Sequence, residues 1–91
     1  MSTSDRFAGK VAVITGGTTG IGRAIARRFV SDGGKIVIGA RHDTLFEEIT
    51  QELGADNCWC QVCDVTNRAQ VDALVQAAYD KFNGFDVMFG N

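Results

Sequence analysis

The chain has 91 residues, of which 45% are hydrophobic, and a formal net charge of −2 at pH 7. This length allows one domain, the apolar fraction is too high for a disordered chain, and the charge argues against a surface for nucleic acid or anionic membranes. No apolar run approaches the ~20 residues of a membrane-spanning helix.

Residues 1–8 lack the basic and apolar segments of a signal peptide, and we expect them to form a flexible tail. The first predicted strand, VAVIT at Val11–Thr15, is apolar and β-branched, which is typical of a strand buried on both faces. After a glycine-rich loop, apolar residues recur at a spacing of four, at Ile21, Ile25 and Phe29. This spacing predicts an amphipathic helix that ends at Gly33-Gly34.

The middle of the chain repeats this alternation. KIVIGA at Lys35–Ala40 predicts a second buried strand. Apolar residues at Phe46, Ile49 and Leu53 then predict a second helix, which stops at Gly54. CWCQVC at residues 58–63 predicts a third strand.

Thr66 is the expected N-cap of a third helix. The apolar stripe of that helix comprises Val71, Leu74, Val75, Ala78 and Phe82. Asn83-Gly84 predicts a turn, and FDVMFG at Phe85–Gly90 predicts a fourth strand.

The element order β-α-β-α-β-α-β indicates an α/β fold with a Rossmann-type parallel sheet and helices on both faces. If the first three strands step in one direction and the chain then crosses back, the strand order is 3-2-1-4. The fourth strand then lies beside the first, at the switch point where such folds bind ligands. We therefore expect residues 9–91 to form the N-terminal portion of a dinucleotide-binding domain that stops after the fourth strand.

Three cysteines, Cys58, Cys60 and Cys63, fall within the third predicted strand. An odd number of cysteines without a secretion signal favours free thiols in a reducing, cytoplasmic compartment. On a strand, Cys58 and Cys60 point to one face and Cys63 to the other. We expect them to act as small buried hydrophobes, with a ligand or redox thiol as the alternative, and we expect no metal site.

The glycine-rich loop TGGTTGIG, residues 15–22, lies between the first strand and the first helix. A helix N-terminus presents unpaired N–H groups and a partial positive charge, which suits a phosphate. Gly16 is expected to allow the tight turn, Gly20 to give the phosphate access, and Gly22 to let the helix pack closely on the sheet. Thr18 and Thr19 add hydroxyl donors.

The spacing of these glycines is G-x-x-x-G-x-G. It matches neither the common dinucleotide fingerprint nor the P-loop, and Lys10 precedes the strand, where it cannot act as a P-loop lysine. Phosphoryl transfer is therefore disfavoured.

In its glycine-rich loop and in three further motifs, the sequence resembles the short-chain dehydrogenase/reductase family. The family signature T-G-x-x-x-G-[IL]-G fits residues 15–22 without a gap, and FAGK at Phe7–Lys10 also matches. Residues 63–66, CDVT, resemble the family's D-V-T segment. Residues 86–91, DVMFGN, resemble D-x-L-V-N-N, with Gly90 in place of the first asparagine.

The resemblance implies an NAD(P) site. Asp64 would accept a hydrogen bond from the adenine amino group beside the Val65 backbone, although an Asx cap of the third helix is the alternative for this side chain. Asn91, with the main chain of Phe89 and Gly90, would approach the adenine-side ribose. The implied cofactor-binding residues are Gly16, Thr18, Thr19, Gly20, Ile21, Gly22, Arg41, Asp64, Val65 and Asn91.

The choice of cofactor depends on the end of the second strand, where an acidic residue would bind the ribose 2′-OH of NAD. This chain has Ala40 and then Arg41, nineteen positions after Gly22. Arginine makes charge-assisted contacts to phosphate, so we predict NADP in preference to NAD.

The family's catalytic serine and Y-x-x-x-K pair are not found in this chain. Its single tyrosine, Tyr79, precedes Lys81 as Y-x-K, and we expect it to pack at the surface. The resemblance implies that the intact enzyme passes a hydride between nicotinamide and a carbonyl or alcohol substrate. The alternatives are a non-catalytic, nucleotide-binding or self-associating fragment and, disfavoured by the further motifs, a flavin or methyl-donor module.

The fourth strand is apolar and would form an exposed edge of the sheet, which invites pairing with another chain. The third helix would lie alone on its face and leave apolar sheet uncovered. We therefore expect a homo-oligomer that associates through the fourth strand or this open face.

Overall fold

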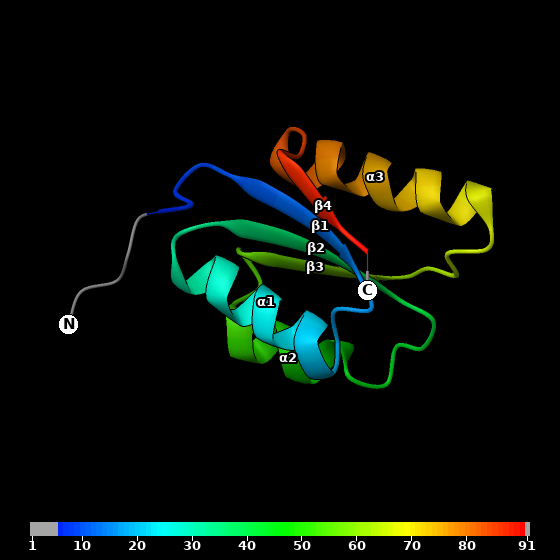
Figure 1. Cartoon of the computed structure of the whole chain (residues 1–91), viewed down its shortest axis with the longest axis horizontal. Coiled ribbons are helices and arrows are strands. Elements are labelled where there is room, and N and C mark those ends of the chain that lie inside the picture. The colour runs from blue at the N-terminus through cyan, green and yellow to red at the C-terminus, as the bar shows by residue number, and fades with distance from the viewer. Residues whose placement is uncertain (1–5, 91) are drawn as a thin grey trace.

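The computed structural model describes residues 6–90, and it places helices on both faces of one parallel sheet (Figure 1). The elements are β1 (Val11–Thr15), α1 (Gly20–Ser31), β2 (Lys35–Ala40), α2 (Phe46–Leu53), β3 (Cys58–Val62), α3 (Arg68–Phe82) and β4 (Val87–Phe89). The strand order is β3-β2-β1-β4, and every strand pair is parallel. The predicted α/β class and the 3-2-1-4 order are confirmed.

Side chains alternate across the sheet and form a cluster on each face. Ala12 and Ile14 of β1 face α1 and α2, whereas Val13 faces α3. The larger cluster comprises Ala12, Ile14, Ala26, Phe29, Ile36, Ile38, Ile49, Leu53 and Cys58. The smaller one comprises Val13, Val37, Cys63, Leu74, Ala77 and Ala78. The two middle strands are therefore buried on both sides, as their continuous apolar sequences predict.

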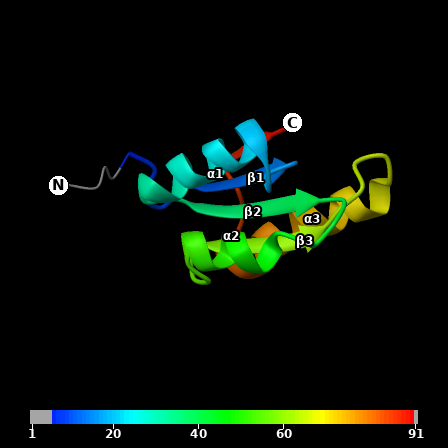
Figure 2. The same cartoon turned by 90° about the horizontal axis from the view of Figure 1, so that it is seen from below.

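Helices α1 and α2 share one face, with α1 over β1 and β2 and α2 over β3 (Figure 2). Phe29 is buried against the sheet, but Ile21, in the first turn of α1, is 72% exposed. The predicted stripe of three apolar residues thus contacts the core only from Ile25 onward. Before β1, the Phe7 ring stacks on Phe29 with 4.4 Å between centroids.

Helix α3 begins at Arg68, and its N-cap lies one residue later than predicted. Asn67 is the N-cap, and its side-chain oxygen accepts a hydrogen bond from the Gln70 N–H at 3.2 Å. The expectation that Thr66 caps the helix is wrong, because the Thr66 hydroxyl donates to Asp64 Oδ1 instead, at 2.7 Å. Asn83 ends the helix in the left-handed conformation, with φ of 68°.

Strands β3 and β4 are shorter than predicted. β3 ends at Val62, because the chain then turns toward α3. Only Val87–Phe89 pair as β4, opposite residues 12–14 of β1. Asp86 lies outside the strand, and its carboxylate accepts a hydrogen bond from the Val11 N–H at 2.8 Å. This contact anchors the start of β4 to the start of β1.

Helix α3 lies alone on its face among the described elements (Figure 1). It covers the middle of the sheet, because Val13 and Val37 beneath it are fully buried. The two edges of this face are less well covered. Met88 of β4 is 42% exposed, and Trp59 of β3 is 38% exposed beneath the Lys81 ammonium, which lies 3.8 Å from the ring centroid.

The three cysteines are free, and they divide between the two faces as predicted. Cys58 and Cys63 are buried in opposite clusters, which confirms them as small core residues. Cys60 is only partly buried. Within residues 6–90, no helix is both long and apolar enough to span a bilayer.

Candidate functional site

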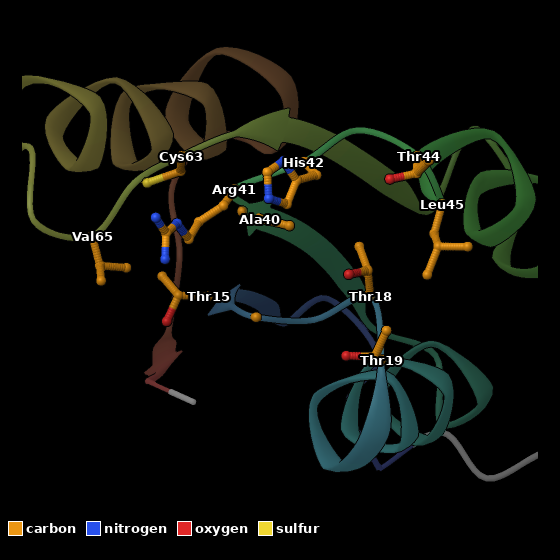
Figure 3. A pocket seen from close by; sticks show the side chains of 12 residues that line it. Thr15, Thr18, Thr19, Ala40, Arg41, His42, Thr44, Leu45, Cys63 and Val65 are labelled. Carbon is orange, nitrogen blue, oxygen red and sulfur yellow. The ribbon is translucent and has the colours of Figure 1, made fainter.

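A cavity of about 370 Å³ opens at the carboxyl ends of β1 and β2 (Figure 3). This is the end of the sheet where parallel α/β folds bind ligands. Residues from three consecutive loops form its wall: the loop after β1, the segment between β2 and α2, and the segment after β3. The cavity is lined by Thr15, Gly16, Thr18, Thr19, Gly39, Ala40, Arg41, His42, Thr44, Leu45, Cys63 and Val65.

The turn that leaves β1 requires glycine at Gly16. Its φ is +74°, a conformation that residues with a Cβ rarely adopt, and its N–H donates to the Gly39 carbonyl at 2.7 Å. Gly20 opens α1 with a φ of +58°, and a Cβ built there would have nothing within 4 Å. The space beside the helix N-terminus is therefore open, which fits the predicted role of Gly20 in giving a phosphate access.

The N-terminus of α1 carries no competing anion. Thr19 is the N-cap residue, but its side chain makes no capping hydrogen bond, and the first turn contains no acidic residue. The hydroxyls of Thr18 and Thr19 both line the cavity in Figure 3. A helix end of this kind favours a negatively charged group through its unpaired N–H groups and its dipole.

Gly17 has a role that the sequence did not indicate. A Cβ at this position would lie 2.8 Å from Ile14 Cγ2 and 2.9 Å from Ile38 Cγ2. The absence of a side chain lets the loop pack directly on β1 and β2. Gly17 thus holds the loop against the sheet, whereas Gly16 and Gly20 shape the space beside the helix N-terminus.

Arg41 follows the last residue of β2 and is exposed. In Figure 3 its guanidinium extends toward the side of the cavity that carries Cys63 and Val65. Its charge also contributes to lowering the pKa of Asp64, which places the two residues near each other. The cavity therefore has a positive group at its outer wall.

Asp64 is engaged by its own loop. Its Oδ1 accepts from the Thr66 hydroxyl at 2.7 Å and from the Thr66 N–H at 2.9 Å, which forms an Asx turn. These two hydrogen bonds are the main reason that the pKa of Asp64 lies below its usual value. Asp64 does not line the cavity, although its neighbours Cys63 and Val65 do.

The cavity brings together five of the predicted site residues: Gly16, Thr18, Thr19, Arg41 and Val65. Gly20, Ile21 and Gly22 form the first turn of α1 outside its lining, and Gly22 is buried. Asn91 lies outside the described residues. The roles of these residues toward a cofactor remain predictions.

Seven lining residues were missed: Thr15, Gly39, Ala40, His42, Thr44, Leu45 and Cys63. Most of them end a strand or follow one directly, so their position relative to the strands was the available signal. Thr44 and Leu45 carry no motif, and only the path of the chain between β2 and α2 brings them to the cavity.

The residues resembling a catalytic pair lie elsewhere. Tyr79 is 52% exposed and packs edge-to-face on Phe85, with 6.1 Å between centroids. Lys81 lies over Trp59. In the part of the chain that the structure describes, no group of three or more histidine, cysteine or acidic side chains is arranged to hold a metal.

The sequence pattern of one protein family, described as short chain dehydrogenase, matches residues 10–91. Momilactone A synthase from Oryza sativa subsp. japonica is 45% identical over 86 residues, which cover 94% of this chain and 31% of that protein. The chain spans about a third of the length of the curated relatives that it matches.

Many solved structures are similar in fold. The glucose dehydrogenase of Caenorhabditis elegans in its apo form has a TM-score of 0.87 and 40% identity, covering 94% of this chain and 38% of that one. The 3-ketoacyl-(acyl-carrier-protein) reductase from Brucella melitensis, complexed with NADH, has a TM-score of 0.84 and 39% identity. That match covers 90% of this chain and 33% of the reductase.

Proposed function

Because the chain belongs to the short-chain dehydrogenase family, we propose that it forms the adenosine- and pyrophosphate-binding part of an NADP-dependent oxidoreductase. In the whole protein, a hydride would pass between NADP(H) and a carbonyl or alcohol substrate. This chain would hold the adenosine half of the cofactor.

The observation that carries the proposal is the position of Arg41 at the wall of the cavity beside the glycine-rich loop. A pyrophosphate at the N-terminus of α1 would receive hydrogen bonds from unpaired N–H groups. The ribose would then extend toward the end of β2, where Arg41 offers planar, charged donors to a 2′-phosphate.

The competing cofactor is NAD. The Brucella melitensis reductase is complexed with NADH, so a relative of this fold accepts a cofactor without the 2′-phosphate. NAD is usually selected by a carboxylate at the end of the second strand, which binds the ribose hydroxyls. Here that position is occupied by Ala40 and Arg41, which favours NADP.

The test uses ligands that contain only the adenosine half. Adenosine 2′,5′-bisphosphate and AMP are titrated by calorimetry into the chain and into Arg41→Gln. Loss of a charged hydrogen-bonding group at an exposed site should weaken binding of the bisphosphate by about 10-fold, corresponding to ~1.5 kcal/mol. The affinity for AMP should remain almost unchanged. Arg68→Gln, an exposed arginine in α3, is the matched control. Equal binding of the two nucleotides by the parent chain would contradict the role of Arg41.

The second candidate is a non-catalytic nucleotide-binding or self-associating unit. It is favoured by the surface positions of Tyr79 and Lys81, which leave the cavity without a proton donor of the family type. We expect no NADPH-dependent carbonyl reduction by this chain alone. Measurable turnover, followed by the decrease in NADPH absorbance, would exclude this candidate.

We also propose a location and partners for the protein. Three free thiols support a cytoplasmic, reducing compartment. The partners would be the dinucleotide, the substrate of the whole protein and, through its exposed strand edge, further copies of the chain.

A further inference from the structure

A cluster of thiols lies at the outer edge of the sheet, in a part of the fold that the proposed nucleotide site does not use. Cys58 and Cys60 project from β3 toward α2, and their sulfurs are 3.7 Å apart. The Thr50 hydroxyl of α2 lies 3.7 Å from the Cys60 sulfur. Both thiols line a cavity of about 390 Å³ between α2 and β3. Its other lining residues are Phe46, Glu47, Thr50, Gln51, Ala55 and Trp59.

We propose that Cys60 is a site of thiol–disulfide exchange with small, uncharged disulfides that enter this cavity. The Cys60 thiolate attacks one sulfur of the incoming disulfide, whose S–S bond breaks as the new bond forms. One half remains on Cys60 as a mixed disulfide, and the other leaves as a thiolate that takes a proton from water. The incoming disulfide is itself the oxidant, so the step requires no further reagent.

The neighbours of Cys60 stabilise its thiolate. When Cys60 is ionised, the Cys58 S–H and the Thr50 O–H both donate to its sulfur. These contacts, that of Cys58 first, lower the pKa of Cys60 to about 7 in spite of its partial burial. The pKa of Cys58 is raised because it retains the shared proton, and burial raises the pKa of Cys63. Of the three thiols, Cys60 alone is both only partly buried and ionised near neutral pH.

This difference predicts the relative rates. At pH 7 about half of Cys60 is thiolate, compared with ~3% of an ordinary thiol with a pKa of ~8.5. Its lower basicity reduces its nucleophilicity, so the net gain over an ordinary thiol is about 3-fold. Cys58 and Cys63 are buried, and their thiolate fraction falls about 10-fold for each unit by which the pKa rises.

The lining of the cavity indicates the class of disulfide. Phe46 and Ala55 offer apolar contacts. Glu47 also lines this cavity, and its carboxylate has no ion-pair partner among residues 6–90. The negative charge of Glu47 would repel an anionic disulfide but not an uncharged aromatic one.

The experiment treats the folded chain with 4,4′-dithiodipyridine at pH 7 and follows the released thiopyridone by absorbance. Acid-quenched samples are digested, and the labelled cysteine is identified by mass spectrometry. We expect one fast equivalent, located on Cys60. Cys60→Ser should slow the initial rate by about 10-fold or more, because only buried thiols remain, and Cys63→Ser should leave it unchanged.

The donors are tested with a matched pair at Thr50. Thr50→Ser keeps a hydroxyl and should keep the rate, whereas Thr50→Val keeps the shape and should slow the reaction toward that of an ordinary thiol, by at most about 3-fold. A purely structural role of Thr50 would not separate these variants. Circular dichroism of each variant checks that it is folded.

The charge preference is tested with the anionic disulfide 5,5′-dithiobis(2-nitrobenzoate). The rate of each reagent with the chain is divided by its rate with N-acetylcysteine. The normalised rate of the anionic reagent should be lower than that of 4,4′-dithiodipyridine. Glu47→Gln should reduce this difference. Label found mainly on Cys58 or Cys63, or a fast phase that survives Cys60→Ser, would overturn the exchange site. Equal normalised rates for the two reagents would overturn the proposed class of disulfide.

Discussion

At the scale of single residues, the glycines of the loop after β1 serve separate purposes. Gly16 and Gly20 adopt positive φ values of 74° and 58°, so they are needed for the path of the backbone. Gly17 has no positive φ, and it is needed because two isoleucine side chains fill the space that a Cβ would take. The first kind of glycine shapes the cavity, and the second kind holds the loop against the sheet.

Gly17→Ala should therefore destabilise the fold. The new methyl group would overlap Ile14 and Ile38, and overpacking of this kind typically costs about 1–3 kcal/mol. Urea unfolding followed by circular dichroism measures the change in the free energy of unfolding. Gly90→Ala is the matched control, since a Cβ there has nothing within 4 Å. If the two variants unfold at the same urea concentration, the loop is free to move away from the sheet and the packing role of Gly17 is wrong.

The loop after β3 shows how a sequence pattern can assign the right residue types to the wrong contacts. Asp64, Thr66 and Asn67 all favour turns and helix caps. Thr66 was expected to cap α3, but its hydroxyl and N–H bind Asp64, and Asn67 takes the capping role. The choice among adjacent capping residues depends on the backbone path from β3 into α3. Asp64 Oδ1 already accepts hydrogen bonds within the turn. The predicted hydrogen bond between Asp64 and a nucleotide therefore stays a prediction.

At the scale of elements, α1 and α2 are joined by an exposed network of opposite charges. Glu52 of α2 binds both Arg23 and Arg27 of α1, and Arg23 also lies 2.8 Å from Glu48. These hydrogen bonds, that of Arg27 first, lower the pKa of Glu52 from 4.5 to about 2. The two helices that cover the same face of the sheet are thus linked at the surface as well as through the core.

The network predicts a defined pH dependence. Because the pKa of Glu52 is lower in the folded state, its contribution to stability is present above pH 4.5 and is lost as the pH falls toward 2. Comparison of urea unfolding of the parent and Glu52→Gln between pH 7 and pH 2 should show a difference that shrinks across this window.

High salt should reduce the same difference at pH 7, because the pairs are exposed. Glu47→Gln removes a charge from the same helix without breaking an ion pair of the described residues, so it should have little effect. A Glu52→Gln difference that persists unchanged at pH 2 would contradict the assignment.

The elements themselves were largely predictable. The bounds of β1, β2 and α2 agree with the apolar patterns of the sequence, since β1 and β2 are short apolar runs and α2 has apolar residues at helical spacing. β3 and β4 proved shorter, because strand length depends on the partner strand and not on the run alone. β4 pairs over three residues, opposite residues 12–14 of β1.

At the scale of the whole molecule, an apolar surface lies beside β4, at one edge of the sheet. Phe7, Ile21, Ile25, Phe29 and Phe89 line a cavity of about 390 Å³ between α1 and β4. β4 has no strand on its outer side within residues 6–90, so its backbone groups there are open to pairing. This geometry agrees with the predicted association through the fourth strand, which remains a prediction.

We expect the chain to form dimers or larger species, measured by size-exclusion chromatography with light scattering. Ile21→Glu places a charge on this surface, and Met88→Lys places one on β4 at the opposite face of the sheet, so each should shift the chain toward the monomer. Val62→Lys, at an exposed position on β3 at the opposite edge, is the control and should change nothing. A monomeric parent chain would refute self-association, and a monomer produced only by Val62→Lys would move the interface to β3.

The amino-acid sequence alone was enough to identify the family, the order of strands and helices, and the loop that would bind a phosphate. These properties follow from local patterns: apolar runs, helical periodicity and glycine spacing act over a few residues and do not depend on distant partners. The family pattern matches residues 10–91, and the motifs in this range are enough to identify the family.

The sequence did not indicate which residues line the same cavity, because that depends on the tertiary fold. The tertiary structure placed Arg41 and Val65 at one cavity, removed Asp64 from its wall, filled the space behind Gly17 and set Thr50 of α2 beside Cys60 of β3. Such contacts join residues that are far apart in sequence, and they depend on strand register and on how each helix sits on the sheet. A local pattern carries no information about that packing, so the thiol cluster became visible only once α2 was placed against β3.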